Sequence, residues 1–336
     1  MGPQLPPHVI DLHIDTFIPV RLWRYDVLRH HGRGPLRGRF FGHLDLPRMR
    51  EAGLTGAMWS ITTNPFRTAR SRWRVFQHNM ERIDALVAES GGQLAWATDA
   101  AGYHQARARG AHAMLLSIQG GNALEAPLRA GTVPTELLQR LTRVTVVHLT
   151  NASLGATSSP AHYMRRDKGL TDLGRDLIAL LNAHRVFVDL AHAHPRTFWD
   201  AVEAHDGSQP LVATHTGICG VRPHWRNLDD AQIRAIADTG GVVGVIFAAA
   251  FLRRRGGPRG PEMVVEHLEH IRNVGGEACP AIGSDYDGAI IPPRGLRSGA
   301  ELPAVVQVMT QRGWTTGQIE GALGGNFLKA FEALRH

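Results

Sequence analysis

Residues 113–121, AMLLSIQGG, form an apolar run of strand length that ends in a glycine pair. Such a run predicts a buried β-strand that passes into a loop. Similar runs recur along the chain with helix-like stretches between them, and we count eight: 9–15, 54–62, 113–121, 144–150, 186–192, 211–216, 241–247 and 279–288. Strands that alternate with helices indicate parallel βα units, so the sequence predicts one (β/α)8 TIM-barrel domain over residues 1–336.

Two features refine this prediction. The helices carry start signals, because Asp229 with Gln232 and Thr315 with Gln318 have the spacing of a capping box. One connection, residues 16–46, is unusually long and is rich in arginine, histidine and aromatic residues. A segment that follows the first strand of a barrel lies over the mouth, where barrel active sites are found, so we predict a lid or substrate wall there.

The composition restricts the class of protein. With 43% hydrophobic and 20% charged residues, the chain is typical of soluble globular proteins. It has no apolar run long enough to span a membrane and no start that resembles a secretory signal, so we expect no membrane partner. Cys219 and Cys279 have no metal-ligand spacing, and so few cysteines fit a reducing compartment, for which we expect the cytoplasm.

The chain is basic, with a formal net charge of +7 that comes mostly from arginine. Arginines cluster at 67–74 and 252–259, but neither cluster lies in a recognisable nucleic-acid-binding signature. We interpret both as solvated surface and expect no nucleic-acid partner.

Histidines and aspartates collect where the predicted strands end. The parallel strands of a barrel open on one face, and a carboxylate buried without a partner is costly, so these side chains are expected to converge on a ligand. Imidazole and carboxylate ligands suit Zn²⁺ or another divalent ion. His194, two residues after His192, is interpreted as structural. The candidates are His13, Asp15, His148, His192, His215 and Asp285.

Several longer stretches form a recognisable pattern. They are DLHIDT (11–16), HLDLPRMREAGLTGAMWSI (43–61), GLTDLGRDLIALLNAHRVFVDLAH (169–192), ATHTG (213–217), RNLDDAQIRAIADTGGVVGV (226–245), IGSDYDG (282–288) and GGNFLKAFE (324–332). Together they resemble the membrane (renal) dipeptidase family, which are metallopeptidases of the amidohydrolase-type barrel superfamily. The resemblance covers nearly the whole chain.

The resemblance implies two zinc ions and a set of roles. One ion would be held by His13 and Asp15, and the other by His192 and His215. Asp285 would serve as a metal ligand or as the general base. The resemblance also implies that Arg226 binds the terminal carboxylate of the substrate, and that His148 helps to hold its carbonyl group.

The chain departs from the family at one motif. Where the family has Glu-Gly-Gly-His, with the Glu bridging both metals, this chain has Gln119-Gly-Gly-Asn122. A glutamine offers one carbonyl oxygen and an NH₂ group that can only donate, so it is a poor bridge between two cations. We therefore predict one well-held ion beside His13, Asp15 and Asp285, with the His192 and His215 site weak or empty. The alternative is that Gln119 only forms hydrogen bonds and both metals still bind.

Three functions remain open from the sequence. The first is hydrolysis of the amide bond of dipeptides or dipeptide-like molecules by a metal-activated water, with Asp285 as general base, His148 as a stabiliser of the oxyanion and Arg226 as the carboxylate clamp. The second is a mononuclear amidohydrolase that acts on another substrate, such as a natural-product amide or a lactone. The third is a barrel retained as a binding protein. A homodimer fits the family but no pattern in the sequence requires it.

Overall fold

The computed structural model describes residues 5–32, 37–164 and 166–335. Its strands are Ile10–Ile14 (β1), Gly56–Thr62 (β2), Leu94–Trp96 (β3), His112–Gln119 (β4), Leu141–Thr145 (β5), Phe187–Asp189 (β6), Val212–Thr216 (β7), Val242–Val245 (β8) and Pro280–Ile282 (β9). Eight of them pair in parallel in the order β1-β2-β4-β5-β6-β7-β8-β9. The ring closes where Asp285 N donates to His13 O at 2.9 Å and Asp15 N donates to Tyr286 O at 2.8 Å. The predicted (β/α)8 barrel is therefore confirmed.

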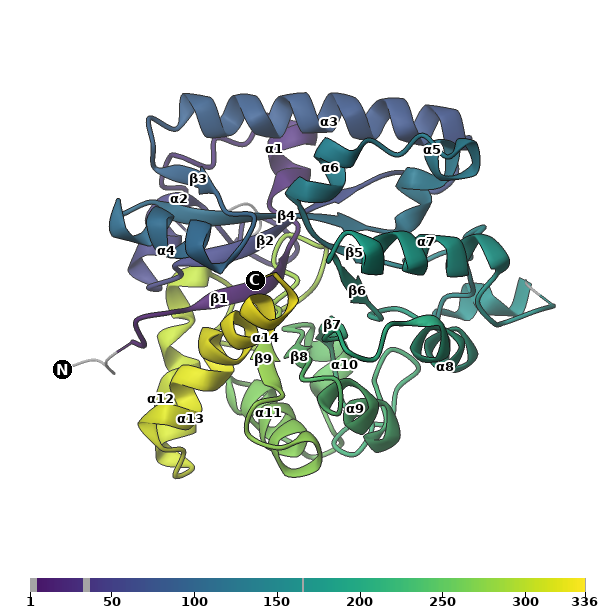
Figure 1. Cartoon of the computed structure of the whole chain (residues 1–336). Helices are drawn as coiled ribbons and strands as arrows, with labels where there is room; N and C mark the ends of the chain where they lie inside the picture. The colour runs from purple at the N-terminus through teal and green to yellow at the C-terminus, as the bar shows by residue number, and fades with distance from the viewer. Residues whose placement is uncertain (1–4, 33–36, 165, 336) are drawn as a thin grey trace.

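The helices cover the outside of this ring (Figure 1). They are Phe17–Trp23 (α1), Leu46–Glu51 (α2), Ala69–Glu89 (α3), Ala100–Ala108 (α4), Glu125–Ala130 (α5), Thr135–Arg140 (α6), Asp172–Ala183 (α7), Pro195–Ala204 (α8), Asp230–Ala237 (α9), Ala249–Leu252 (α10), Glu262–Gly275 (α11), Pro303–Gln311 (α12), Thr316–Glu320 (α13) and Asn326–Leu334 (α14). Both predicted capping boxes are present, at the starts of α9 and α13.

Two strand predictions need correction. β3 was not predicted; it pairs with β4 outside the closed ring, and three residues are too few to show a strand period. The predicted strand 144–150 lies instead at β5, Leu141–Thr145, so His148 lies three residues beyond the strand end. The polar residues Thr142 and Arg143 occupy the first half of β5 and hide its start from an apolar pattern.

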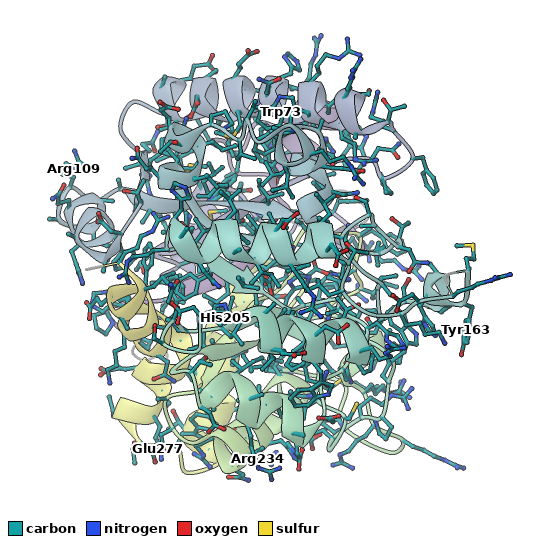
Figure 2. The ribbon with its side chains drawn as sticks, turned by 45° about the vertical axis from the view of Figure 1, so that its right-hand side comes forward. Trp73, Arg109, Tyr163, His205, Arg234 and Glu277 are labelled. Atoms are coloured by element: carbon teal, nitrogen blue, oxygen red, sulfur yellow. The ribbon has the colours of Figure 1, made fainter. Side chains whose placement is uncertain are left out.

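The two ends of the barrel differ in chemistry. At the amino ends of the strands, Ile10, Phe187 and Val212 pack against Phe327 and Phe331 of α14. Figure 1 shows α14 lying across this end of the ring. In Figure 2, Tyr163, which follows β5, projects from the opposite side of the molecule to Arg109, which precedes β4. An apolar plug at one end leaves the carboxyl ends of the strands as the face that can hold a polar site.

The long connection 16–46 begins with α1, directly after β1. Tyr25 Oη donates to Leu44 O at 3.0 Å, and Arg48 Nη2 donates to the same hydroxyl at 2.9 Å, so the described parts of the connection fold back on α2. Its predicted role as a lid stays a prediction, and residues 33–36 lie outside the described chain. In the part of the chain that the structure describes, no helix combines the length and apolar character needed to cross a bilayer.

Candidate metal centre

Every predicted site residue lies at the carboxyl end of the barrel. His13 is in β1 and Asp15 follows it; Gln119 ends β4; His215 is in β7; and His148, His192 and Asp285 follow β5, β6 and β9. Arg226 lies in the connection between β7 and α9. His194 instead caps α8, where its Nδ1 accepts from Arg196 N at 3.2 Å, so the structure keeps it as a helix cap.

His13 lies between two carboxylates. Its Nε2 is 3.3 Å from Asp285 Oδ1 and 3.7 Å from Asp15 Oδ2, and it has no hydrogen-bond partner although it is fully buried. Burial alone would lower the pKa of His13, but Asp15 and Asp285 raise it. Burial raises the pKa of Asp285 to about 6, against the opposing effect of His13.

A second pair of imidazoles adjoins this group. His192 Nε2 and His215 Nε2 are 2.8 Å apart, and the His215 ring stacks on that of His13 with 3.8 Å between ring centroids. Ligand atoms of His13, His215 and Asp285 all lie within 4.8 Å of one another. The sequence prediction grouped His215 with His192 alone, whereas the structure also brings it to His13 and Asp285.

Two of these residues have unusual backbone geometry. His192 has φ of 67° and Asp285 has φ of 61°, both in the left-handed region. Side chains larger than glycine are uncommon there, and such geometry persists only where the surrounding structure holds it. Both residues follow the last residue of a strand by three positions, so the turn brings each side chain back over the barrel mouth.

Gln119 lies within the same group. Its Oε1 accepts from Thr62 Oγ1 at 2.8 Å, and its Nε2 is 3.4 Å from His215 Nε2. The Thr62 hydroxyl also lies 3.3 Å from Asp15 Oδ1. The amide therefore turns its donor group towards His215, where a carboxylate would have offered a second ligand oxygen.

A buried ion pair that the sequence prediction missed lies beneath the centre. Arg143 and Asp189 are both fully buried, with 3.3 Å between Nη1 and Oδ2. Arg143 Nη2 donates to His13 Nδ1, which leaves the hydrogen of a neutral His13 on Nε2. A metal ion at Nε2 would displace this hydrogen, as metals displace protons from their ligands.

The same pair reaches His215 through a threonine. Thr214 Oγ1 donates to Asp189 Oδ2 at 2.7 Å, so its oxygen accepts from His215 Nδ1 at 2.9 Å. His215 Nδ1 therefore carries the hydrogen, and Nε2 presents a lone pair to the mouth. Thr145 Oγ1 donates to the same Asp189 oxygen at 2.7 Å. The ion pair thus orients His13 and His215, one histidine from each of the two predicted metal sites.

Two further candidates line the mouth. The His148 ring lies edge-on to that of His192, with 4.7 Å between centroids, and burial lowers the pKa of His148 to about 4. Arg226 is buried, its Nη2 donates to His215 O at 2.6 Å, and its Nε has no partner. Burial lowers the pKa of Arg226 to about 10, so the guanidinium is still charged at neutral pH.

These residues fit a divalent metal ion. Imidazole and carboxylate oxygens are ligands of Zn²⁺ and similar ions, and His215 already presents the required lone pair. The unpartnered, buried His13 Nε2 among two carboxylates is a second indication, because buried polar atoms are normally paired.

Comparison with known proteins identifies similar chains and structures. The dipeptidase AC, a metallopeptidase of family M19, has 28% sequence identity and a TM-score of 0.82, over 98% of this chain and 99% of that one. A metallopeptidase from Rhodobacter sphaeroides, solved with a phosphinate mimic of the dipeptide L-Ala-D-Ala, has 27% identity and a TM-score of 0.82 over 98% and 99%. The probable dipeptidase PvdM from Pseudomonas aeruginosa, at 18% identity and a TM-score of 0.84 over 98% and 95%, shares the fold.

A Klebsiella pneumoniae protein, described as an uncharacterized protein in the pqqA 5′ region, is 39% identical over 167 residues. That match covers 49% of this chain and 60% of the relative. The model of the family described as membrane dipeptidase (peptidase family M19) matches residues 6–336. The chain therefore belongs to the membrane dipeptidase family, peptidase family M19.

Proposed function

We propose that this protein is a metal-dependent hydrolase that cleaves the amide bond of dipeptides or dipeptide-like molecules. The observation that carries the proposal is the convergence of His13, His215 and Asp285 within 4.8 Å at the barrel mouth, with Arg226 buried nearby. Family membership supports the same reaction, and the relative from Rhodobacter sphaeroides was solved with a dipeptide mimic.

For the metal we propose a single zinc ion. His13 and Asp285 would hold it, with Asp15 or His215 as the third ligand, which leaves a position open as catalytic zinc sites do. His192 would contribute to a second, weaker site. The support is Gln119, whose Oε1 is engaged by Thr62 and whose Nε2 faces His215, so that it offers no bridging oxygen. When bound, such an ion polarises a carbonyl group and lowers the pKa of water.

Three side chains would then have separate roles in the reaction. Asp285, whose Oδ1 lies 3.3 Å from His13 Nε2, would accept a proton from the attacking water and pass it to the leaving amine. His148, neutral at pH 7, can donate an N–H to the developing oxyanion. Arg226 would exchange its bond to His215 O for a two-pronged contact with the terminal carboxylate of the substrate.

Three wider features belong to the proposal. The segment 16–46 would form one wall of the substrate site, since α1 follows directly from the strand that carries His13. Cys219 and Cys279 are both unpaired, which supports a reducing compartment such as the cytoplasm. A homodimer would be consistent with the family, and its test is the mass of the purified protein in solution.

The decisive experiment combines metal content with turnover. Protein purified with zinc is analysed for zinc per chain and then assayed with L-Ala-D-Ala and L-Ala-L-Ala. About one zinc per chain with dipeptide cleavage supports the proposal. Zinc without cleavage of any dipeptide favours a mononuclear amidohydrolase with another amide or lactone substrate, and absence of bound zinc would leave only a binding role.

A further inference from the structure

A guanidinium lies beside the metal centre without a carboxylate of its own. Arg21, on α1, donates from Nη1 to Thr62 O at 3.1 Å, and its Nε is buried without a partner. The hydroxyl of the same Thr62 donates to Gln119 Oε1 at 2.8 Å. Arg21 and Gln119 are therefore joined through a single residue at the carboxyl end of β2.

The charges around Arg21 leave it uncompensated. Burial lowers the pKa of Arg21; Asp15 is the charge that opposes this effect, while Arg82 and Arg67 reinforce it. None of these three arginines forms an ion pair with any of the residues described by the structure. A metal ion at Asp15 would take up the one nearby negative charge. The half-buried guanidinium, held at the end of β2 by Thr62 O, would then have no counter-ion.

The departure at position 119 increases this imbalance. Thr62 contacts both Arg21 and the side chain at position 119. A glutamate at 119, as in the family motif, would therefore place a negative charge near Arg21, with only Thr62 between them. The glutamine of this chain keeps the hydrogen bond to Thr62 but carries no charge. An anionic ligand beside Arg21 would therefore be attracted by a positive charge, and the nearby carboxylates that could repel it would be bound to the metal ion.

The strand end that holds Arg21 lies across the barrel from the strand that Arg226 follows. In the ring order β1-β2-β4-β5-β6-β7-β8-β9, the strands β2 and β7 are four places apart, on opposite sides of an eight-stranded barrel. Arg21 is bound to the end of β2, and Arg226 follows β7. A substrate whose terminal carboxylate is held by Arg226 would extend its other end over the metal ligands towards the end of β2, where Arg21 is bound.

We propose that Arg21 is a second anion-binding residue of this site, and that the preferred substrates are dipeptide-like amides with an anionic group on the residue at the amino side. A side-chain carboxylate is the form that an ordinary dipeptide offers, and a phosphorylated side chain presents the same charge. This inference rests on the proposed function, since it assigns one end of the substrate to Arg226.

The test compares substrates that differ only in this charge. The zinc-loaded protein is assayed with Glu-Ala against Gln-Ala and with phosphoserine-Ala against Ser-Ala. The variants are Arg21→Gln, Arg21→Lys and, as a matched control, Arg24→Gln, which removes an exposed charge at the end of the same helix. Calorimetric binding of each dipeptide is measured alongside turnover, and thermal melting confirms that each variant folds.

We expect the native protein to favour the anionic member of a pair at least tenfold in kcat/KM, mainly through KM. Arg21→Gln should abolish that preference by raising KM for the anionic member of each pair, Arg21→Lys should restore part of the preference, and Arg24→Gln should keep it. Preference for Glu-Ala without preference for phosphoserine-Ala assigns the site to carboxylates, and the reverse result assigns it to phosphates. Cleavage of neutral dipeptides with no preference in either pair overturns the inference but leaves the proposed function standing. Failure to cleave any dipeptide counts against the proposed function, and the binding data still decide the role of Arg21.

Discussion

Replacing Thr214 by valine tests whether the buried Arg143–Asp189 pair prepares His215 for a metal ion. The Thr214 hydroxyl donates to Asp189 Oδ2 at 2.7 Å and accepts from His215 Nδ1 at 2.9 Å. Valine has the same shape but offers neither bond. His215 then has no partner that fixes the hydrogen on Nδ1, and its Nε2 lone pair is no longer held towards the mouth.

The structure supplies a matched control in Thr145. Its hydroxyl donates to the same oxygen of Asp189 at the same distance, 2.7 Å, and accepts from Arg143 Nη1, whereas the Thr214 hydroxyl accepts from His215. Each threonine thus makes two hydrogen bonds, and only Thr214 contacts a histidine directly. Thr145→Val and Thr214→Val should therefore lose similar stability, about 1–3 kcal/mol for an unmade buried hydrogen bond. In the metal affinity they should differ, because loss of a bond that orients a ligand typically costs about 10–100-fold, or roughly 1.4–2.8 kcal/mol.

The assay is competition for zinc against a chromophoric chelator, with unfolding of the metal-free proteins followed in urea. We expect the zinc affinity of Thr214→Val to fall at least tenfold below that of Thr145→Val at equal stability. If both variants bind zinc as the native protein does, the reasoning about His215 is refuted. If both lose affinity equally, the effect passes through Asp189 and Arg143, and the Thr214 contact has no role of its own.

Three other predictions follow from the same geometry. Gln119→Glu should raise the zinc content, measured by elemental analysis, towards two ions per chain, because it restores a bridging carboxylate next to Thr62. The same added charge should lower the preference for acidic substrates. An unchanged zinc content would show that the amide is not what limits zinc binding at the second site. Asp285→Asn should lower kcat by about 10²–10⁴ in protein that is fully loaded with zinc, as loss of a general base does; near-native kcat in the zinc-loaded variant would remove Asp285 from that role. Burial lowers the pKa of His267 to about 4, so its contribution to stability is present above pH 6.5 and is lost as the pH falls towards 4. Because other buried histidines such as His148 lose stability over the same range, the test is the difference between two proteins: the fall in urea stability between pH 7.5 and 4.5 should be roughly 2–3 kcal/mol smaller in His267→Gln than in the native protein, and an equal fall in both would contradict the assignment.

The barrel could be predicted from the sequence because its strands are buried on both faces and read as apolar runs. Reliance on apolar runs also misplaced β5, because the polar residues Thr142 and Arg143 interrupt its first half. The strand was therefore predicted at 144–150 and not at Leu141–Thr145. The polar side chains at the strand ends were found for the complementary reason: each stands out against an apolar strand.

What the sequence could not show was how the charges inside the strands pair. Asp189 stood within the predicted strand 186–192, and Arg143 stood directly before the predicted strand 144–150. A charged residue at a buried position is a signal that a partner exists. Nothing in a single sequence joins positions that are 46 residues apart on neighbouring strands, since the pairing depends on the register of β5 against β6. Arg21 was hidden differently, among many arginines of a basic chain, and only its contact with Thr62 distinguishes it.

The left-handed backbone at His192 and Asp285 has a consequence for how this centre can change by mutation. Asparagine and glycine tolerate such a conformation, whereas β-branched residues do not, so the exchanges accessible at these two positions are few. Gln119 ends an extended strand, where the backbone conformation sets no such limit on the side chain. The backbone therefore restricts exchange at the two ligands on the turns more than at position 119, and the departure of this chain from the predicted metal ligands lies at the position that the backbone restricts least.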